Sequence, residues 1–505
     1  MVEGSELAGT SVRWLTATQL HKGYAAGTLD PVEVCEQVLA AIEELDDQLN
    51  AFVSVHRDEA LAAATGSRRR FEQGRALGPA DGIPTCIKDI LLTRGHPTLR
   101  GSTLVEAAGP WTEDAPAVAR LREGGAVLLG RTTTPEFAWK GTTDSIRHGV
   151  TTNPWDPGRT AGGSSGGSAS AVAAGMSTWS VGTDGGGSVR IPAAFTGTVA
   201  LKPTYGRIPL WPASPYGTLS HAGPMTRSVR DAATLLDLIG VPDDRDWSHL
   251  PTAGMPSLAG LDDGVAGLRV AFSLSLGWDG VDEGVSAVVT QAVQVLADAG
   301  AVVEQVDPPL GERAVLEHAF HVLWFTGAAK VLRGYGEDVL DRVDPGLARQ
   351  VRRYADCSAQ DYLDAVSVRM ELGRAMGAFH RDHDVLVCPT MPVAAFSTDR
   401  QSPPGWSSDL WTSWAALTYP FNMTQQPALS VPCGLVADGG HAGLPVGLQV
   451  VGARHTDALV LRVGQAYEQA TRWHTLRPPR STGASTGMST GASSATPTPS
   501  TTGDP

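Results

Sequence analysis

Two glycine-rich runs and one upstream lysine carry the residue types that acyl transfer needs. Ser164 lies in Ala161-Gly-Gly-Ser-Ser-Gly-Gly-Ser168, Ser188 lies in Gly182-Thr-Asp-Gly-Gly-Gly-Ser-Val-Arg190, and Lys88 ends Gly82-Ile-Pro-Thr-Cys-Ile-Lys88. A serine hydroxyl attacks a carbonyl only when another group takes its proton, and glycines beside it leave backbone N–H groups free for the oxyanion. We therefore interpret the trio as a nucleophile, a proton shuttle and a base.

The elements that must position these residues are predicted from the pattern between residues 76 and 475. Short apolar runs, typical of strands, occur at 126–130, 268–272, 301–306 and 385–388, and an amphipathic helix is expected at 285–299. Such alternation predicts an α/β fold, with a mostly parallel or mixed sheet covered by helices. A chain of 505 residues could build it as one large domain or as two or three ordinary domains.

Two flanking segments differ from this pattern. Residues 1–75 are expected to form an N-terminal helical layer, in which Asp30 caps one helix and Pro31 occupies its first position. Residues 481–505 consist almost entirely of Ser, Thr, Gly, Ala and Pro. Such a segment cannot bury enough apolar surface to offset its ordering entropy, so we expect a disordered tail, with a partner-binding segment as the alternative.

Composition narrows the class of protein. With 505 residues, 42% hydrophobic and 18% charged, the chain is typical of a globular protein, and it lacks an apolar run long enough to span a bilayer. The N-terminus has no signal-peptide pattern, so a cytoplasmic location is expected. The five widely spaced cysteines fit neither a disulfide framework nor a zinc site. A net charge of −14 disfavours nucleic-acid binding. We expect no cofactor and no metal.

In this order and spacing the three runs are similar to the amidase signature family of Ser-cisSer-Lys hydrolases. The likeness covers roughly residues 76–475 and extends through further motifs: Asn153-Pro-Trp-Asp-Pro157, Leu201-Lys-Pro-Thr-Tyr-Gly-Arg207, Gly223-Pro-Met-Thr-Arg227, Pro427-Ala-Leu-Ser-Val-Pro-Cys-Gly434 and Gly443-Leu-Pro-Val-Gly-Leu-Gln449. The resemblance implies an α/β fold with a single large catalytic domain over residues 76–475, whose central sheet is twisted, mixed and mostly parallel, with helices on both faces. It implies that Ser188 is the nucleophile of an acyl-enzyme. It also implies that Lys88 is the base and that Ser164, preceded by a cis peptide bond, relays the proton.

The same resemblance assigns the supporting residues. Gly185, Gly186 and Gly187 would present backbone N–H groups to the oxyanion, although relatives often carry a larger residue at position 185. Asp184 and Arg190 would hold this turn closed through a salt bridge. Ser165 and Thr183 would be additional hydrogen-bond donors behind the catalytic groups.

Two other interpretations compete for the glycine runs. Such runs are often linkers, but the second run and Lys88 argue against a linker here. Gly163-Ser-Ser-Gly-Gly167 also matches the Gly-x-Ser-x-Gly elbow of α/β-hydrolases, in which Ser165 would be the nucleophile, with His383 and Asp382 or Asp384 as nominal partners. That motif explains neither Lys88 nor the Ser188 run. Neither glycine run matches a nucleotide-binding pattern.

The expected substrate is a small neutral amide with an aryl or alkyl group, or a related carbamate, anilide, hydrazide or ester. Trp139, Thr142, Trp324 and Trp414 are the candidate pocket residues, because an aromatic lining favours such groups. The alternative is the glutamine-amidase subunit of a tRNA-dependent amidotransferase. Glutamine-specific relatives carry an acid near the position of Ala415, which disfavours that alternative. We expect a monomer or homodimer that binds neither nucleic acid nor membrane.

Overall fold

An 11-stranded sheet forms the centre of the computed structural model, which describes residues 11–251, 256–278, 280–406 and 408–479. The tail expected at 481–505 lies outside these residues. In spatial order the strands are β1 (Phe52–Val55), β3 (Val127–Thr132), β2 (Pro84–Lys88), β6 (Trp179–Asp184), β8 (His221–Thr226), β7 (Val199–Lys202), β12 (Ala428–Leu435), β13 (Pro445–Gly452), β11 (Val385–Pro389), β9 (Arg269–Phe272) and β10 (Val302–Gln305). The strands β4 (Asp144–Ser145) and β5 (Gly149–Val150) form a separate hairpin.

The sheet is mixed, as predicted. Parallel pairs join β3, β2 and β6 in one part of the sheet and β11, β9 and β10 in another. Antiparallel pairs join the strands between these two groups and attach the edge strand β1. The predicted strands at 126–130, 268–272, 301–306 and 385–388 correspond to β3, β9, β10 and β11, and the helix expected at 285–299 is α8 (Glu283–Asp298).

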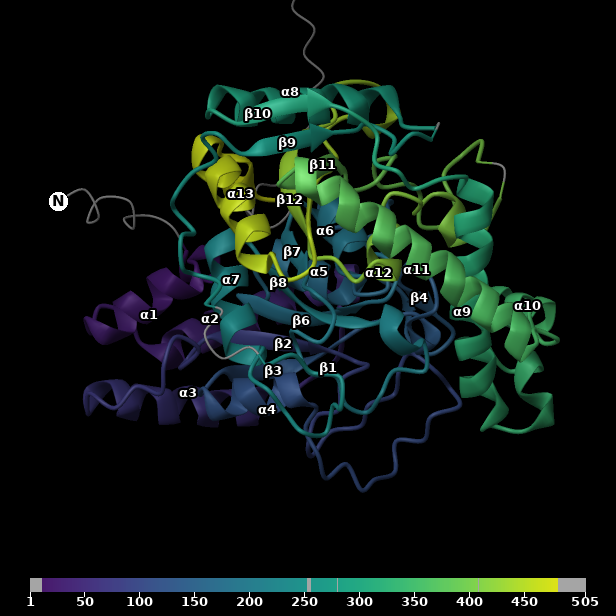
Figure 1. Cartoon of the computed structure of the whole chain (residues 1–505). Coiled ribbons are helices and arrows are strands. Elements are labelled where there is room, and N and C mark those ends of the chain that lie inside the picture. The colour runs from purple at the N-terminus through teal and green to yellow at the C-terminus, as the bar shows by residue number, and fades with distance from the viewer. Residues whose placement is uncertain (1–10, 252–255, 279, 407, 480–505) are drawn as a thin grey trace, which may run out of the picture.

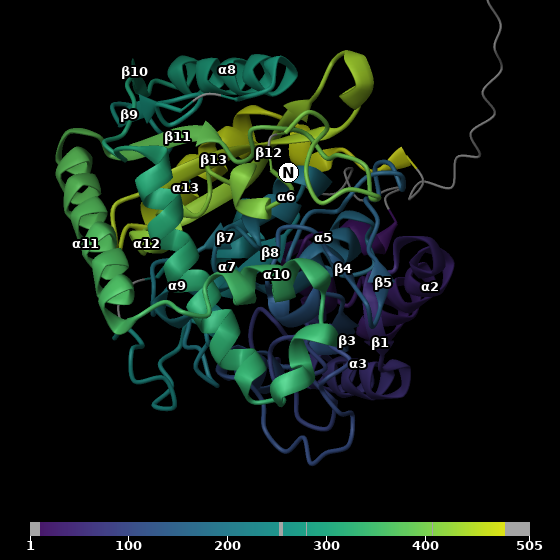
Figure 2. The ribbon, with the colours of Figure 1, turned by 90° about the vertical axis from the view of Figure 1, so that its right-hand side faces the viewer.

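Helices cover both faces of this sheet. Successive side chains of a strand point to opposite sides, so one strand can contact helices on both faces. In β12, Leu429 and Val431 face Gly464 of α13 (Asp457–Ala470), whereas Ser430 points to the other face, near Ala194 of α6 (Arg190–Thr196). α7 (Val229–Ile239) packs against α13, and α5 (Gly166–Ala173) packs against α6. α9 (Arg313–Arg333) and α11 (Ala359–Asp382) lie side by side at the edge of the molecule (Figures 1 and 2).

The described part of the N-terminal segment is mainly helical and also contributes a strand. Its helices are α1 (Ala17–Ala25), α2 (Pro31–Leu49) and α3 (Arg57–Glu72), and the Asp30 carboxylate caps α2 by accepting a 2.8 Å hydrogen bond from the Val32 N–H. β1 lies between α2 and α3 and pairs with β3, so this segment is continuous with the central sheet. The remaining helices are α4 (Pro116–Glu123), α10 (Pro345–Arg353) and α12 (Pro420–Met423). None of the described helices is both long and apolar enough to cross a bilayer.

Candidate active site

Lys88 is the last residue of β2, and the adjacent parallel strand β6 ends at Asp184. The carboxyl ends of neighbouring parallel strands meet at the same edge of a sheet, where α/β proteins commonly bind ligands. The Lys88 side chain is fully buried, and its Nζ lies 2.8 Å from Ser164 Oγ, 2.8 Å from Ser165 Oγ and 2.9 Å from Thr183 Oγ1. Three of the residues singled out from the sequence therefore surround the predicted base.

The environment of Lys88 favours the neutral amine. Burial lowers the pKa of Lys88 well below its usual range, and the charge of Asp184 opposes this shift only in part. Among the described residues, each hydrogen-bond partner of Lys88 Nζ is a hydroxyl group rather than a carboxylate. The neighbouring Asp89 points elsewhere, because its Oδ1 accepts a 2.9 Å hydrogen bond from the buried Arg131 guanidinium.

Ser164 and Ser165 lie at the start of α5, which begins at Gly166. The peptide bond between Gly163 and Ser164 is cis, as the resemblance implied. A Cβ atom at position 163 would lie 2.5 Å from the Thr142 backbone, so only glycine fits there. Thr142 thus packs behind the serine loop. Its hydroxyl donates a 2.8 Å hydrogen bond to Asp144.

Ser188 follows β6 on a turn that the Asp184 carboxylate holds in place. Asp184 accepts hydrogen bonds from the N–H groups of Gly187 (2.8 Å) and Val189 (3.2 Å), and it forms a fully buried salt bridge with Arg190 at 2.9 Å. Burial alone would raise the pKa of Asp184, but Arg190 outweighs it and holds the pKa well below the usual range. The Asp184–Arg190 contact predicted from the sequence is therefore present.

A residue that the sequence analysis did not single out completes this turn. Asn422, in α12, donates a 2.8 Å hydrogen bond to Asp184 Oδ1 and accepts a 2.6 Å hydrogen bond from Arg190. It lies far along the chain from β6, and a single asparagine between apolar residues has no pattern that reveals such a contact. The sequence offers one indication of such a partner, the charge of Arg190. A buried guanidinium needs more hydrogen-bond acceptors than one carboxylate supplies.

The three predicted oxyanion-binding glycines differ in their surroundings. The Gly187 N–H already donates to Asp184, which differs from its predicted role. The N–H groups of Gly185 and Gly186 have no protein acceptor among the described residues. A Cβ at position 185 would lie 2.6 Å from the Trp324 ring, and one at 186 would lie 2.6 Å from the Trp411 ring. The Trp324 ring thus occupies the space that a side chain at position 185 would need.

A cavity of about 170 Å³ lies beside this turn and is lined by both Ser164 and Ser188. Trp324, one of the candidate pocket residues, also lines it and stacks on Tyr216 with ring centroids 3.8 Å apart. The polar atoms of this ring pair are occupied, because Trp324 Nε1 donates to the Trp139 carbonyl and the Tyr216 hydroxyl donates to the Phe137 carbonyl. The pair therefore presents apolar ring surface beside the two serines.

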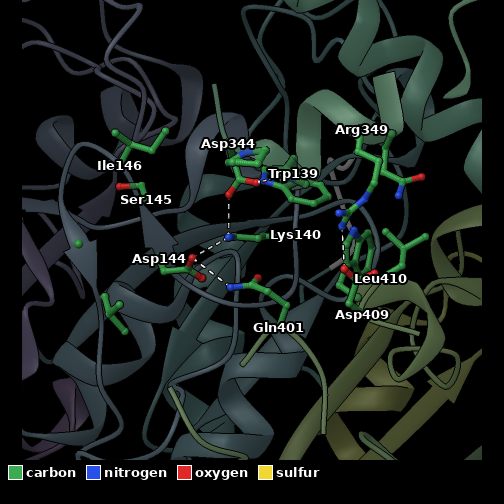
Figure 3. Close-up of a pocket in the computed structure, with 16 residues that line it drawn as sticks. Trp139, Lys140, Asp144, Ser145, Ile146, Asp344, Arg349, Gln401, Asp409 and Leu410 are labelled. Atoms are coloured by element: carbon green, nitrogen blue, oxygen red, sulfur yellow. Dashed lines mark hydrogen bonds and ion pairs between the residues drawn. The ribbon is translucent and has the colours of Figure 1, made fainter. Parts of the chain in front are cut away.

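The other predicted pocket residues lie outside this lining. Trp139 lines a separate cavity of about 470 Å³, in which Lys140 bridges Asp144 and Asp344 at 2.6 and 2.8 Å (Figure 3). Trp414 is fully buried and stacks on Phe195. The predictions for Trp139 and Trp414 rest on residue type alone, which does not indicate which side of an element an indole occupies.

Two further groups could have offered different chemistry. The Ser165 hydroxyl donates to the Thr183 carbonyl, and no described histidine bonds to it; His383 is paired with Glu304 at 3.1 Å. The elbow interpretation therefore lacks the histidine base that it requires.

Among the described residues, His56, Glu59 and His96 form a cluster whose donor atoms are close enough together for a metal. The two imidazole rings stack at 3.5 Å with an interplanar angle of 11°, so their in-plane lone pairs do not converge on one ion.

Comparison with known proteins identifies the family. The amidase family model matches residues 33–461. The chain is 36% identical to an acylamidase of Rhodococcus erythropolis, over 93% of this chain and 98% of that protein. It is also 36% identical to a glutamyl-tRNA(Gln) amidotransferase subunit of Chloroflexus aurantiacus, over 93% of this chain and 99% of that protein.

Among solved structures, a bacterial aryl acylamidase superposes with a TM-score of 0.85 at 29% identity, covering 92% of this chain and 99% of that one. A 6-aminohexanoate cyclic dimer hydrolase superposes with a TM-score of 0.81 at 29% identity, covering 92% and 99%. The motifs, the fold and these matches agree, and the chain belongs to the amidase signature family.

Proposed function

We propose that this chain is an amidohydrolase that cleaves the C–N bond of small aryl or alkyl amides, or of related carbamates and anilides, through an acyl-enzyme on Ser188. The observation that supports this proposal most directly is that the buried Lys88, whose pKa is lowered, contacts Ser164, and that Ser164 and Ser188 line one cavity. A neutral amine can accept a proton, which an ordinary exposed lysine cannot do near neutral pH.

The hydrogen bonds around Lys88 suggest the route of that proton. The Ser165 hydroxyl donates to the Thr183 carbonyl, so Ser165 Oγ accepts from Lys88. A neutral amine has two N–H groups and one lone pair. If the N–H groups serve Ser165 and Thr183, the lone pair faces Ser164. Ser164 can then pass its proton to Lys88 while it takes the proton of Ser188.

The chemical steps follow from this arrangement. Ser188 Oγ bonds to the substrate carbonyl carbon, and its proton moves through Ser164 to Lys88. The oxyanion forms where the N–H groups of Gly185 and Gly186 are free to donate, while the Gly187 N–H keeps the turn closed on Asp184. The C–N bond breaks as Lys88 returns the proton through Ser164 to the leaving nitrogen. Water then cleaves the ester on Ser188 by the same path.

The cavity suggests the substrate class. Its volume of about 170 Å³ is close to that of engineered cavities of about 150 Å³ that bind benzene, and the Trp324 and Tyr216 rings form one wall. A ring or a short alkyl chain fits that space. The names of an acylamidase and an aryl acylamidase among the similar proteins support the same class.

A glutamine-amidase component of an amidotransferase remains the second candidate, because the likeness to the amidotransferase relative equals that to the acylamidase in identity. Against it, no Asp or Glu lies among the described residues that line the cavity, so nothing there would pair with the α-ammonium of glutamine. Ala415, at the position expected to carry that acid, is fully buried.

The test is a panel of anilides, aryl-acetamides, aryl carbamates and glutamine, assayed with the wild type and with Ser188→Ala. We expect turnover of an aromatic amide that disappears in Ser188→Ala and persists in Ser367→Ala, which removes an exposed serine hydroxyl from α11. Hydrolysis of glutamine alone, or of nothing until a second protein is added, would favour the amidotransferase candidate. Unchanged rates in Ser188→Ala would contradict the mechanism.

A further inference from the structure

Arg100 lines the same cavity as Ser164 and Ser188, and its charge has no partner within the described residues. No hydrogen bond, ion pair or ring contact joins its guanidinium to another described group. No Asp, Glu, Lys or His is among the other residues of the lining. Among the described residues that line the cavity with the two serines, Arg100 therefore carries the one formal charge, and that charge is positive.

The backbone of Arg100 is held firmly in an uncommon conformation. Its φ of 56° lies in the left-handed region, which residues other than glycine rarely adopt. Its N–H donates to the Asp89 carbonyl at 3.1 Å, and its carbonyl accepts from the Phe137 N–H at 2.8 Å. These bonds join Arg100 to the residue after Lys88 on one side and to the cavity wall on the other. These two bonds therefore hold the backbone of Arg100 in place beside the active site.

Left-handed residues are concentrated at this cavity. Within the described ranges, the residues other than glycine with positive φ number seven, and three of them, Arg100, Phe137 and Ala138, line the cavity. Such conformations cost free energy and persist where the surrounding structure enforces them, often at ligand sites. Here they hold the backbone of Arg100 and of Phe137 in the lining of the cavity.

The chemistry of this arrangement indicates the ligand. A guanidinium presents parallel N–H donors that match the two oxygens of a carboxylate, and the pair is strongest where apolar walls exclude water. Arg100 is only partly exposed, and much of the remaining lining is apolar or aromatic. With no protein acid available among the lining residues, the counterion must come from the molecule that enters.

We propose that Arg100 binds a carboxylate of the substrate, so that the preferred amides carry an anionic group that is separate from the bond that breaks. This rests on the proposed function and narrows it. The substrate is neutral at the scissile bond, apolar beside Trp324, and anionic at Arg100. A neutral amide can still react, but it lacks the contact that Arg100 offers.

Matched substrate pairs test this inference. One pair places the carboxylate on the acyl side, as glutaric monoanilide against valeranilide, and the other places it on the amine side, as 4-acetamidobenzoate against 4-acetamidotoluene. We expect kcat/KM to favour the acid by about tenfold or more in at least one pair. In Arg100→Met that preference should fall to about one, with the neutral substrates within about threefold of wild type. Arg100→Lys should retain part of the preference, because it keeps the charge but loses the parallel N–H donors of the guanidinium.

Arg94→Met is the matched control, because Arg94 is exposed on the same loop and does not line the cavity. It should keep the wild-type preference. Two results would overturn the inference: neither acid preferred over its neutral partner, or a preference that survives in Arg100→Met.

A binding measurement separates this inference from the proposed function. Calorimetric titration of Ser188→Ala with benzoate and 3-phenylpropionate requires no turnover, with benzyl alcohol as the neutral control. At least one carboxylate should bind, and adding Arg100→Met should weaken it about tenfold or more. Carboxylate binding through Arg100 in a protein that hydrolyses no amide would refute the proposed function alone. Amide hydrolysis with no carboxylate binding would refute the Arg100 inference alone.

Discussion

Lys88 contacts the hydroxyl oxygens of Ser164, Ser165 and Thr183, and these partners are compatible with the proposed role of the buried lysine as a base. A carboxylate in direct contact would hold the proton on the amine, whereas hydroxyl groups stabilise either protonation state. Asp184 is close enough to influence Lys88, but Arg190 and Asn422 already bind its carboxylate. The Asp184 carboxylate, which could have kept Lys88 protonated, is thus bound within the turn that carries Ser188.

The pH dependence of activity follows from the lowered pKa of Lys88. Only the neutral amine can accept a proton, so kcat/KM should rise with pH through the Lys88 pKa. Because burial lowers that pKa, the acid limb should lie well below the range in which free lysine titrates, near 10.4. The measurement is a pH profile of kcat/KM on an aryl amide. An acid limb that appears only at the free-lysine range would contradict the assignment.

Variants at Lys88 separate the base from a merely structural cation. Lys88→Ala should lower kcat by about 10²–10⁴-fold, the usual contribution of a positioned acid–base group. Lys88→Arg should not restore activity, because a guanidinium does not lose its proton. Lys330→Met, which removes an exposed lysine from α9, should behave as wild type. Recovery of activity in Lys88→Arg would contradict the role of Lys88 as a base.

For single residues, the sequence predicts the contacts that depend on local motifs and misses those that depend on tertiary packing. Lys88, Ser164 and Ser188 stand in short motifs at strand ends and helix starts, so local pattern locates them. Arg100 lies in a loop without periodicity, and its proposed role depends on a cavity that distant residues, such as 210–216 and Trp324, help to line. Trp139 and Trp414 have the residue type that the pocket favours, but tertiary packing decides which indoles reach the cavity.

The turn between β6 and α6 is the element on which the proposed oxyanion site depends. Asp184 ends the strand, Arg190 begins the helix, and their salt bridge closes the residues between them. Gly185 and Gly186 lie against the rings of Trp324 and Trp411, which belong to distant parts of the chain. The indoles of Trp324 and Trp411 thus pack directly on the turn, and a side chain at position 185 or 186 would have to displace one of them.

Substitution at Gly185 tests this packing. A Cβ at 185 would lie 2.6 Å from the outer ring of Trp324, so Gly185→Ala should displace the turn or the indole. Loss of one oxyanion donor typically lowers kcat by about 10²–10³-fold, and we expect a fall of at least about tenfold. Gly373→Ala in α11 is the control, because no atom lies within 4 Å of its added Cβ. Steady-state kinetics with a thermal melt would compare the two.

A second substitution distinguishes the clash from a general loss of folding. Trp324→Phe removes the ring atoms that a Cβ at 185 would meet, so the double variant should regain part of the activity lost in Gly185→Ala. No recovery in the double variant would show that the contact with Trp324 is not the cause.

Across the whole molecule, the sheet brings together residues that the sequence separates widely. β2, β6 and β8 lie side by side, and the segments that line the cavity come from residues 90–100, 137–138, 164–188, 210–220 and 324–331. Alternating apolar runs predicted the α/β class and several strands. The strand order, the antiparallel centre and the insertion of β1 between two helices depend on long-range pairing, which local pattern does not encode.

The C-terminal segment gives a prediction at the same scale. Because its composition offers almost no large apolar side chains, deletion of residues 481–505 should leave the melting temperature within about one or two degrees of the full chain. Calorimetry of the two proteins checks this. A large fall in melting temperature would mean that the segment packs on the folded chain.

The central claim is that Ser188 forms the acyl-enzyme, and peptide mapping by mass spectrometry after rapid quenching tests it most directly. An activated aryl carbamate is suitable, because carbamoyl-enzymes are slowly hydrolysed. We predict one carbamoyl group on Ser188 rather than on Ser164 or Ser165, absent from Ser188→Ala and still formed in Ser165→Ala. A carbamoyl group on Ser164 or Ser165 in the wild type, or one that persists in Ser188→Ala, would contradict the account.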